Sequence, residues 1–325
     1  MYKQTHLRSG ALILTLAGLM AYAAMGGYYA NEIVIEIAIL GIMVIALDIA
    51  AGFGGMVSLC HGAIMGVSAY VYAIMTAKFG WPNLPSALMG VAAAAVFGTL
   101  VGYVTGRTAG IFFIMATLAF GQMAHTLFFK SRWLGGDDGM GGFTRFDLSA
   151  VGIDMNDSVT FSAYALLLVL CVYIAAAYVL RSGFGRTLEG IHGNEDRMKA
   201  LGVDTQLHKA RAMGFSALLT GVAGVLAAQH VMYISPELLM WTVSGEVLIV
   251  VILGGLGTLV GPLIGAVAFV LLKHEVSAYT AHWHIVIGAL LIVTVLAGGK
   301  GMFGTAERLL TRRPAPARTE EAADA

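Results

Sequence analysis

The sequence predicts an all-α fold, a polytopic bundle of eight to ten transmembrane helical segments, some of them broken. Hydrophobic residues make up 58% of the 325-residue chain and charged residues 12%, whereas about 25% of an average soluble domain is charged. The apolar residues fall in blocks of about 20, the helix length that crosses ~30 Å of hydrocarbon. The alternating pattern of membrane β-strands is missing. Helices are therefore expected, because they satisfy their own backbone hydrogen bonds in lipid.

Nine apolar blocks define the expected helices. They span residues 11–26, 33–51, 62–77, 85–105, 111–129, 161–180, 212–231, 243–272 and 283–297. The block 243–272 is too long for one plain helix and contains a glycine-rich interruption, so it could form two short passes. Lys3 and Arg8 in front of the first block imitate the start of a secretory signal, but we expect an uncleaved first span.

Basic residues orient the bundle. Lys3 and Arg8 place the amino terminus in the cytoplasm, because lysine and arginine in short loops stay on that side. Five blocks later, the loop 130–160 carries more Asp than Lys and Arg and is expected to be periplasmic. The next loop, 181–211, contains six basic residues and is expected to be cytoplasmic. Basic residues beyond the last block favour a cytoplasmic carboxyl terminus.

The chain is therefore divided into a transmembrane domain, residues 1–310, and a tail, residues 311–325. The tail is rich in Pro, Ala and charged residues and is expected to be disordered, because it cannot bury enough apolar surface to order itself. The formal net charge of zero argues against a nucleic-acid partner. Cys60 and Cys171 fall in or beside expected spans, so no disulfide framework or metal site is predicted.

Two glycine-rich helix breaks lie in opposite halves of the chain. The first contains Gly52, Gly54 and Gly55, and the second contains Gly254, Gly255, Gly257, Gly261 and Pro262. Paired breaks at membrane depth indicate a transport pathway, because they expose backbone groups and helix ends there. Alternatively, the glycines only allow close helix packing. Ser58 is expected to cap the restarted first helix, and Pro262 to suit a first helical position.

Small residues recur every fourth position along and just after the block 85–105. They are Gly90, Ala94, Gly98, Gly102 and Gly106. This spacing puts them on one stripe of a helix, where another backbone can approach closely. We interpret the stripe as a packing face without chemistry.

Polar residues inside the apolar blocks need partners or water. They are Glu36, Asp48, His61, Gln122, His125, Gln229 and Glu246. Residues near block edges are expected at the membrane interface, namely Glu32, Gln229, His230 and Lys273. Asp48, His61 and Glu246 lie deeper, and two roles stay open for them: a hydrogen bond between helices, or contact with a solute.

The segment 194–204 has the residue order of a short helix with both ends marked. Asn194 is a suitable N-cap residue, and Gly202 is suited to end the helix. Glu195 and Asp196 fall in the first turn and Lys199 in the last, as the helix dipole favours. Met198 and Leu201 are expected to share one face. An isolated helix of about eight residues is only marginally stable in water, so it is expected to dock on another surface. That surface is either a partner protein or the lipid headgroups. The acidic residues of the helix are poorly suited to the headgroups.

Four ordered segments resemble the permeases of branched-chain amino acid ABC importers, specifically the M-type subunit. They are the glycine-rich segment 52–63, the helix 113–121, the segments 185–188 and 194–204, and the closing run 234–262. Cys60 stands where that family usually has glycine, Asp48 where asparagine is common, and the segment 134–139 only approximates a Thr-Gly-Gly loop. These departures leave the solute open among branched-chain amino acids, other amino acids, urea, amides and aromatic acids.

The resemblance implies a subunit of the bacterial inner membrane that forms half of a solute pathway. It implies a sister permease, two ABC ATPase subunits that hold ATP and Mg²⁺, and a periplasmic solute-binding protein. No Gly-x-x-x-x-Gly-Lys-Ser/Thr loop occurs in the sequence, so ATP is expected to act through another chain. We predict no catalytic residue, metal or cofactor in this chain. The alternative is a secondary transporter driven by an ion gradient.

Two sets of site residues follow from these patterns. The pathway is expected to involve Ser58, His61, Thr117, Gln122 and Glu246. Coupling to the ATPase is expected to involve Asn194, Glu195, Asp196, Arg197, Met198, Lys199, Ala200, Leu201 and Gly202.

Overall fold

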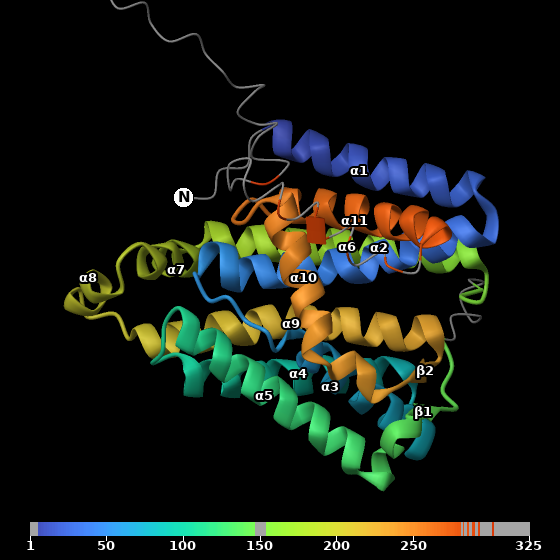
Figure 1. Ribbon diagram of the computed structural model, residues 1–325, viewed down its shortest axis with the longest axis horizontal. Coiled ribbons are helices and arrows are strands. Elements are labelled where there is room, and N and C mark those ends of the chain that lie inside the picture. The colour runs from blue at the N-terminus through green and yellow to red at the C-terminus, as the bar shows by residue number, and fades with distance from the viewer. Residues whose placement is uncertain are drawn as a thin grey trace, which may run out of the picture.

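The computed structural model describes residues 6–146 and 154–280, together with the single residues 282, 285, 288, 289, 292 and 301. The long helices lie in two layers (Figure 1). One layer contains α1, α2, α6 and α11, and the other contains α3, α4, α5 and α9. Helix α10 crosses between the layers. Helices α7 and α8 project beyond one end of the bundle.

The bounds of the helices agree with most of the expected blocks. The helices are α1 (His6–Met25), α2 (Gly27–Asp48), α3 (His61–Ala73), α4 (Asn83–Thr105), α5 (Ile111–Lys130), α6 (Ser158–Arg181), α7 (Gly183–Gly193), α8 (Glu195–Ala200), α9 (Thr205–Val231), α10 (Trp241–Gly254) and α11 (Val260–Tyr279). π-Helical turns Ile49–Phe53 and Ile74–Lys78 extend α2 and α3, and the short turns Arg132–Leu134, Gly136–Asp138 and Pro236–Leu239 are 3₁₀.

Six helices of the described part of the chain are long and apolar enough to cross a membrane: 27–53, 83–105, 111–130, 158–181, 205–231 and 260–279. Two shorter apolar helices span 9–25 and 241–254. The predicted polytopic all-α fold is confirmed, and the long block 243–272 is indeed two helices, α10 and α11. The block 283–297 is described only at isolated positions, and Lys3, residues 147–153 and the tail 311–325 lie outside the described residues.

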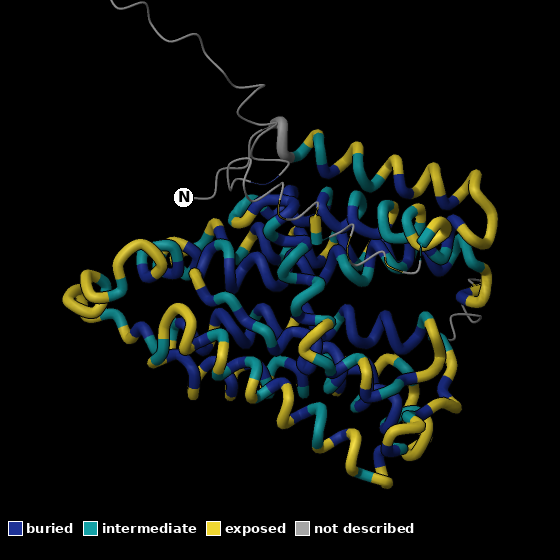
Figure 2. Tube along the Cα trace, viewed as in Figure 1, coloured by how far each residue is buried: buried dark blue, intermediate teal, exposed yellow. Residues whose placement is uncertain are grey.

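Helices α2 and α9 form the centre of the bundle. Most of α2 is buried, because its apolar residues cover every side and leave no polar face to turn outward. Figure 2 shows this buried centre and the exposed tip at α8. By contrast, α5 lies at an edge and exposes Phe112, Met115 and Met123. An exposed apolar face of this kind suits lipid or another membrane subunit.

The small-residue stripe of α4 is a packing face, as predicted, and most of it lies against α9. A Cβ atom at Gly98 would overlap the Cβ of Ala217, and a Cβ at Gly102 would lie 2.5 Å from that of Met213. The two backbones can approach this closely only because the stripe lacks side chains.

We expect Gly98→Ala to destabilise the protein by about 1–3 kcal/mol, the usual effect of overpacking. Gly18→Ala is the matched control, since Gly18 also lies in an apolar helix but has no atom within 4 Å of the position that an added methyl group would take. Thermal unfolding of both variants in detergent measures the difference. Equal stability of Gly98→Ala and the wild type would contradict the close packing.

Part of the predicted periplasmic loop 130–160 is held against α9. Two residues of it, Met140–Gly141 (β1), pair antiparallel with Tyr233–Ile234 (β2). The Arg145 guanidinium donates to the carbonyl oxygens of Gln229 at 3.1 Å and His230 at 3.3 Å. The sequence did not predict this strand pair, because two residues are too few to carry an alternating pattern.

Candidate functional site

The first helix break runs from Ile49 to Cys60. Helix α2 widens into a π-helical turn over Ile49–Phe53 and ends at Gly54 and Gly55, of which Gly55 has φ +66°. Residues 56–60 are non-helical, and α3 begins at His61. Irregular backbone at membrane depth persists only where it is buried in protein or lines a cavity.

The second break separates α10 from α11. Gly255 and Gly257 have φ angles of +113° and +76°, which favour glycine. The Thr258 hydroxyl accepts a hydrogen bond from Gly261 N at 3.0 Å and so satisfies one N–H in the first turn of α11. Pro262 is the third residue of α11 and not its first. It still lies in the first turn, where its missing N–H leaves no helical hydrogen bond unmade.

The two breaks meet at Asp48. Its carboxylate is wholly buried and accepts hydrogen bonds from Gly257 N at 2.7 Å and from Leu259 N at 3.0 Å. Gly52 lies against the same group, since a Cβ there would overlap Asp48 Oδ1 and lie 2.5 Å from Gly257 N. We term Asp48, Gly52 and residues 255–259 the Asp48 junction. At this residue the structure favours the hydrogen bond between helices over contact with a solute.

Ser58 does not cap α3, contrary to the prediction. Its hydroxyl accepts from Cys60 N at 3.3 Å, while Gly62 N in the first turn of α3 donates to Ser244 of α10 at 2.8 Å. The reason is that α3 begins three residues after Ser58, out of reach of its hydroxyl. The residue that satisfies this helix end therefore comes from the other half of the chain.

Three predicted pathway residues hold the first break in place. Ser58, His61 and Thr117 are wholly buried. His61 Nε2 lies 2.9 Å from the hydroxyl of Ser216, which donates to Ala46 O at 2.5 Å. The Thr117 hydroxyl accepts from Leu59 N at 3.2 Å, fixing the extended segment against α5. His61 thus links α3, α9 and α2.

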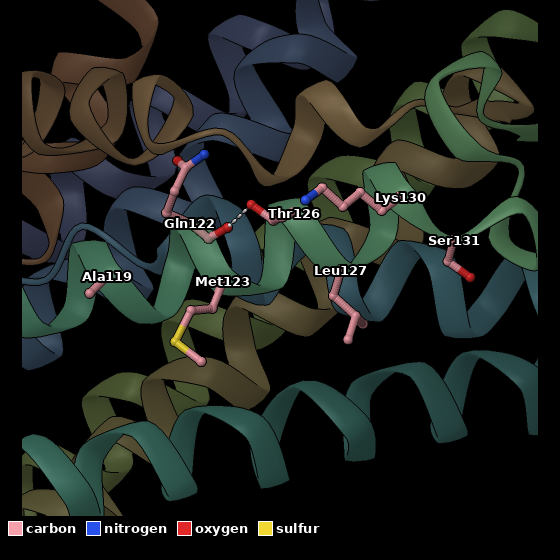
Figure 3. A pocket seen from close by; sticks show the side chains of 7 residues that line it. All are labelled: Ala119, Gln122, Met123, Thr126, Leu127, Lys130 and Ser131. Carbon is pink, nitrogen blue, oxygen red and sulfur yellow. Dashed lines mark hydrogen bonds between the residues drawn. The ribbon is translucent and has the colours of Figure 1, made fainter.

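Gln122 lies elsewhere, on the exposed side of α5. A groove of about 830 Å³ is lined by Ala119, Gln122, Met123, Thr126, Leu127, Lys130 and Ser131. Figure 3 shows Gln122 and Lys130 on one side of α5 and Met123 and Leu127 on the other. Polar side chains on a membrane helix face protein or water in preference to lipid. This side of α5 is consequently suited to a polar pathway or a second subunit.

Glu246 lies in a second cavity, of about 380 Å³, and most of its polar neighbours were not predicted as site residues. Lys273 Nζ lies 2.8 Å from Glu36 and 3.9 Å from Glu246. Glu32, His230 and Lys273, which were expected at the membrane interface, all line this cavity. Gln229, expected there too, is wholly buried. The i, i+4 spacing of Glu32 and Glu36 in the sequence indicates that they share one face of a helix. It does not show which other helix that face contacts.

Helix α8 carries the predicted coupling residues. The Asn194 side chain accepts from Arg197 N at 2.9 Å, and Gly202 has φ +83°, so the expected cap and stop are both present. The helix has 6 residues, shorter than expected. Met198 packs on Gly190 of α7, whereas Leu201 is 72% exposed, so the two do not share a buried face.

One ion-pair cluster anchors α8 to the start of α9. Glu195 accepts from Lys209 at 2.6 Å, from Thr205 at 3.0 Å, and pairs with Lys199 at 3.2 Å. Burial alone would raise the pKa of Glu195, but hydrogen bonds from Lys209 and Lys199 outweigh it and lower the pKa. The carboxylate therefore stays charged at neutral pH, and the anchor is lost only as the pH falls through that lowered pKa. Residues 205–211, expected in the loop, belong to α9, because Asp204 caps it.

Helix α7 connects α8 to the first break. It was not predicted as a separate helix, yet it buries Leu188 and Ile191. A Cβ at Gly54 would lie 3.3 Å from Leu188 Cδ1, and one at Gly55 would lie 2.7 Å from the His192 ring. Helix α7 therefore contacts the residues next to the Asp48 junction directly.

Helices that break and meet inside the bundle, an outward groove on α5 with polar and apolar lining, and short helices projecting from one end define a multi-pass membrane transport protein. The chain belongs to the family of branched-chain amino acid transport system permease components, which it matches over residues 29–295. The family predicted from the sequence is thereby confirmed.

Named relatives agree with this assignment. The chain is 26% identical over 338 residues to the high-affinity branched-chain amino acid transport system permease protein LivM of Escherichia coli (strain K12), covering 95% of this chain and 79% of that protein. It is 26% identical over 306 residues to the LivM protein of Salmonella typhimurium, covering 86% and 71%. A probable LivM permease of Methanocaldococcus jannaschii is 27% identical over 122 residues, covering 37% and 35%.

Proposed function

We propose that this chain is the permease subunit of an ATP-driven importer in the bacterial inner membrane, with both termini in the cytoplasm. It forms half of the pathway for a branched-chain amino acid or a similar small polar solute, which a periplasmic binding protein delivers. A sister permease forms the other half, and two ABC ATPase subunits hold ATP and Mg²⁺. The contact of α7 with the first helix break carries this proposal.

The geometry of α7 and α8 supports an ATPase docking site. Helix α8 buries none of its residues, and it is too short to be stable without a partner. It is nevertheless held rigidly, through Glu195 and Lys209, on the long central helix α9. A rigid projection that contacts the first break through α7 suits the transmission of ATPase closure to the bundle.

The groove on α5 supports a shared pathway. Gln122, which is exposed, and Thr126, which is half-buried, line this groove on a helix at an edge of the bundle. A second permease against α5 would enclose the groove and shield these polar groups from lipid. Solute would then pass between the two permeases beside the buried segment that Thr117 holds.

Crosslinking from α8 and uptake measurements test the proposal together. A photoreactive amino acid in place of the exposed Leu201 is expected to capture an ATPase subunit in membranes. The same amino acid in place of Leu14, 76% exposed on α1, is the control and is expected to capture none. Uptake into proteoliposomes is expected to require ATP and that subunit. Uptake by this chain alone, driven by an ion gradient, would overturn the proposal in favour of a secondary transporter.

A further inference from the structure

The cavity of about 380 Å³ beside Glu246 has a charged side and an apolar side. Helices α2, α9, α10 and α11 contribute its charged and titratable groups: Glu32, Glu36, His230, Glu246, Lys273 and His274. Its apolar lining includes Ile39, Leu40 and Val247. Its volume falls in the range of about 300–1,000 Å³ typical of small-molecule sites.

The Glu36 carboxylate is held by two side chains of α11. Lys273 donates to Glu36 Oε1 at 2.8 Å, and His274 Nε2 donates to Glu36 Oε2 at 2.7 Å. The Tyr29 hydroxyl lies 3.3 Å from the other ring nitrogen of His274, Nδ1. The described lining thus places carboxylates and an ammonium group side by side, which suits a ligand that carries both charges.

These charges are not sealed in the core as a structural salt bridge would be. The side chains of Glu36, Lys273 and Glu246 are 36%, 29% and 33% exposed. A charged side chain that is partly exposed within a membrane bundle must face water or a polar ligand, because lipid solvates a charge poorly.

We propose that this cavity is a binding site for a zwitterionic amino acid with an aliphatic side chain. The α-carboxylate would pair with Lys273 and His274, and the α-ammonium with Glu36 and Glu246. The side chain would lie against the apolar lining. This inference rests on the proposed function and places a solute site beside α2 and α11, separate from the groove on α5.

Charge pairing explains why a zwitterion fits better than a single ion. A zwitterion that enters between Lys273 and Glu36 replaces one ion pair by two, so no buried charge loses its partner. A lone anion would draw Lys273 away from Glu36 without supplying a cation in its place, and a lone cation would draw Glu36 away from Lys273 without supplying an anion. A metal ion is a poorer candidate, since the described residues contain no group of three or more His, Cys, Asp or Glu placed to hold one.

The site is tested by measuring the binding of radiolabelled leucine to the full-length chain. The chain is placed in nanodiscs together with any subunits that co-purify with it. Leucine is expected to bind, and leucinamide or 4-methylpentanoate to compete about tenfold or more less well, because each lacks one charge. Glu246→Gln should weaken leucine binding about 10- to 100-fold, as when one partner of a charge pair is lost. Glu237→Gln, a change at an exposed carboxylate outside the cavity, is the control and should leave binding unchanged.

A second variant guards against misfolding. Leu40→Phe adds bulk to the apolar lining without removing a charge and should weaken leucine binding while gel filtration stays normal. Wild-type leucine binding in both folded variants, or no binding of any aliphatic amino acid at millimolar concentration, would overturn the site. If ATP-dependent uptake persists without such binding, the site alone is wrong. If leucine binds but uptake needs no ATPase, the proposed energy source is wrong and the site stands.

Discussion

Replacing Asp48 with leucine is expected to abolish folding or transport. The leucine side chain cannot accept the hydrogen bonds that Gly257 N and Leu259 N now donate. Each buried N–H left without an acceptor is unfavourable by about 1–3 kcal/mol. Two of them remove a large share of the ~5–15 kcal/mol by which a protein is stable. The yield of monodisperse protein and its thermal unfolding in detergent measure the loss.

Asp48→Asn is the matched comparison, because it keeps one acceptor oxygen in the same place. Its amide nitrogen would face the second N–H donor, so we expect intermediate stability. This expectation agrees with the resemblance noted above, in which asparagine is common at this position. If Asp48→Leu were as stable as the wild type, the Asp48 junction would not hold the two breaks together.

Local features of the structure could be predicted because neighbouring residues encode them. Asn194 and Gly202 mark the ends of α8 within nine positions, and the stripe containing Gly98 follows the period of a single helix. The lengths of the apolar blocks, likewise, predicted the membrane helices. Each of these signals depends only on residues that lie close in the chain.

Contacts between distant segments could not be predicted in the same way. Asp48 and Gly257 are 209 residues apart, and Lys273 and Glu36 are 237 residues apart. Ser58 was assigned as a cap because it is local, whereas the acceptor turned out to be Ser244, 182 residues from Gly62. A single sequence shows that Asp48 and Glu246 need partners but gives no means of choosing them.

Helix α7 was missed for a different reason. Gly183 and Gly185 have low helix propensity, so the start of α7 reads as a loop. Two other features override that propensity. The Ser182 hydroxyl accepts from Phe184 N at 3.2 Å, and Leu188 and Ile191 are buried against the bundle. Tertiary packing commonly overrides local preference in this way.

Leu188→Ala is expected to uncouple ATP hydrolysis from transport. Leu188 of α7 is wholly buried and faces the first break. A Cβ atom at Gly54 would lie 3.3 Å from its Cδ1 atom. Truncating a buried leucine weakens packing by about 2–5 kcal/mol, which would loosen α7 from the break while α8 stays anchored to α9. The ratio of solute uptake to ATP hydrolysis in proteoliposomes should then fall about tenfold or more, since ~1.4 kcal/mol already corresponds to tenfold.

Arg186→Ala is the control for this uncoupling, because Arg186 is exposed on the same helix. It should leave both uptake and hydrolysis near the wild-type values. Binding of the ATPase to Leu188→Ala should also persist, since Asn194, Glu195 and Leu201 keep their surroundings on α8. A folded Leu188→Ala variant that transports as many solute molecules per ATP as the wild type would show that movement does not reach the Asp48 junction through α7. The contact between α9 and the π-helical turn Ile49–Phe53 would then be the remaining route between α8 and the first break.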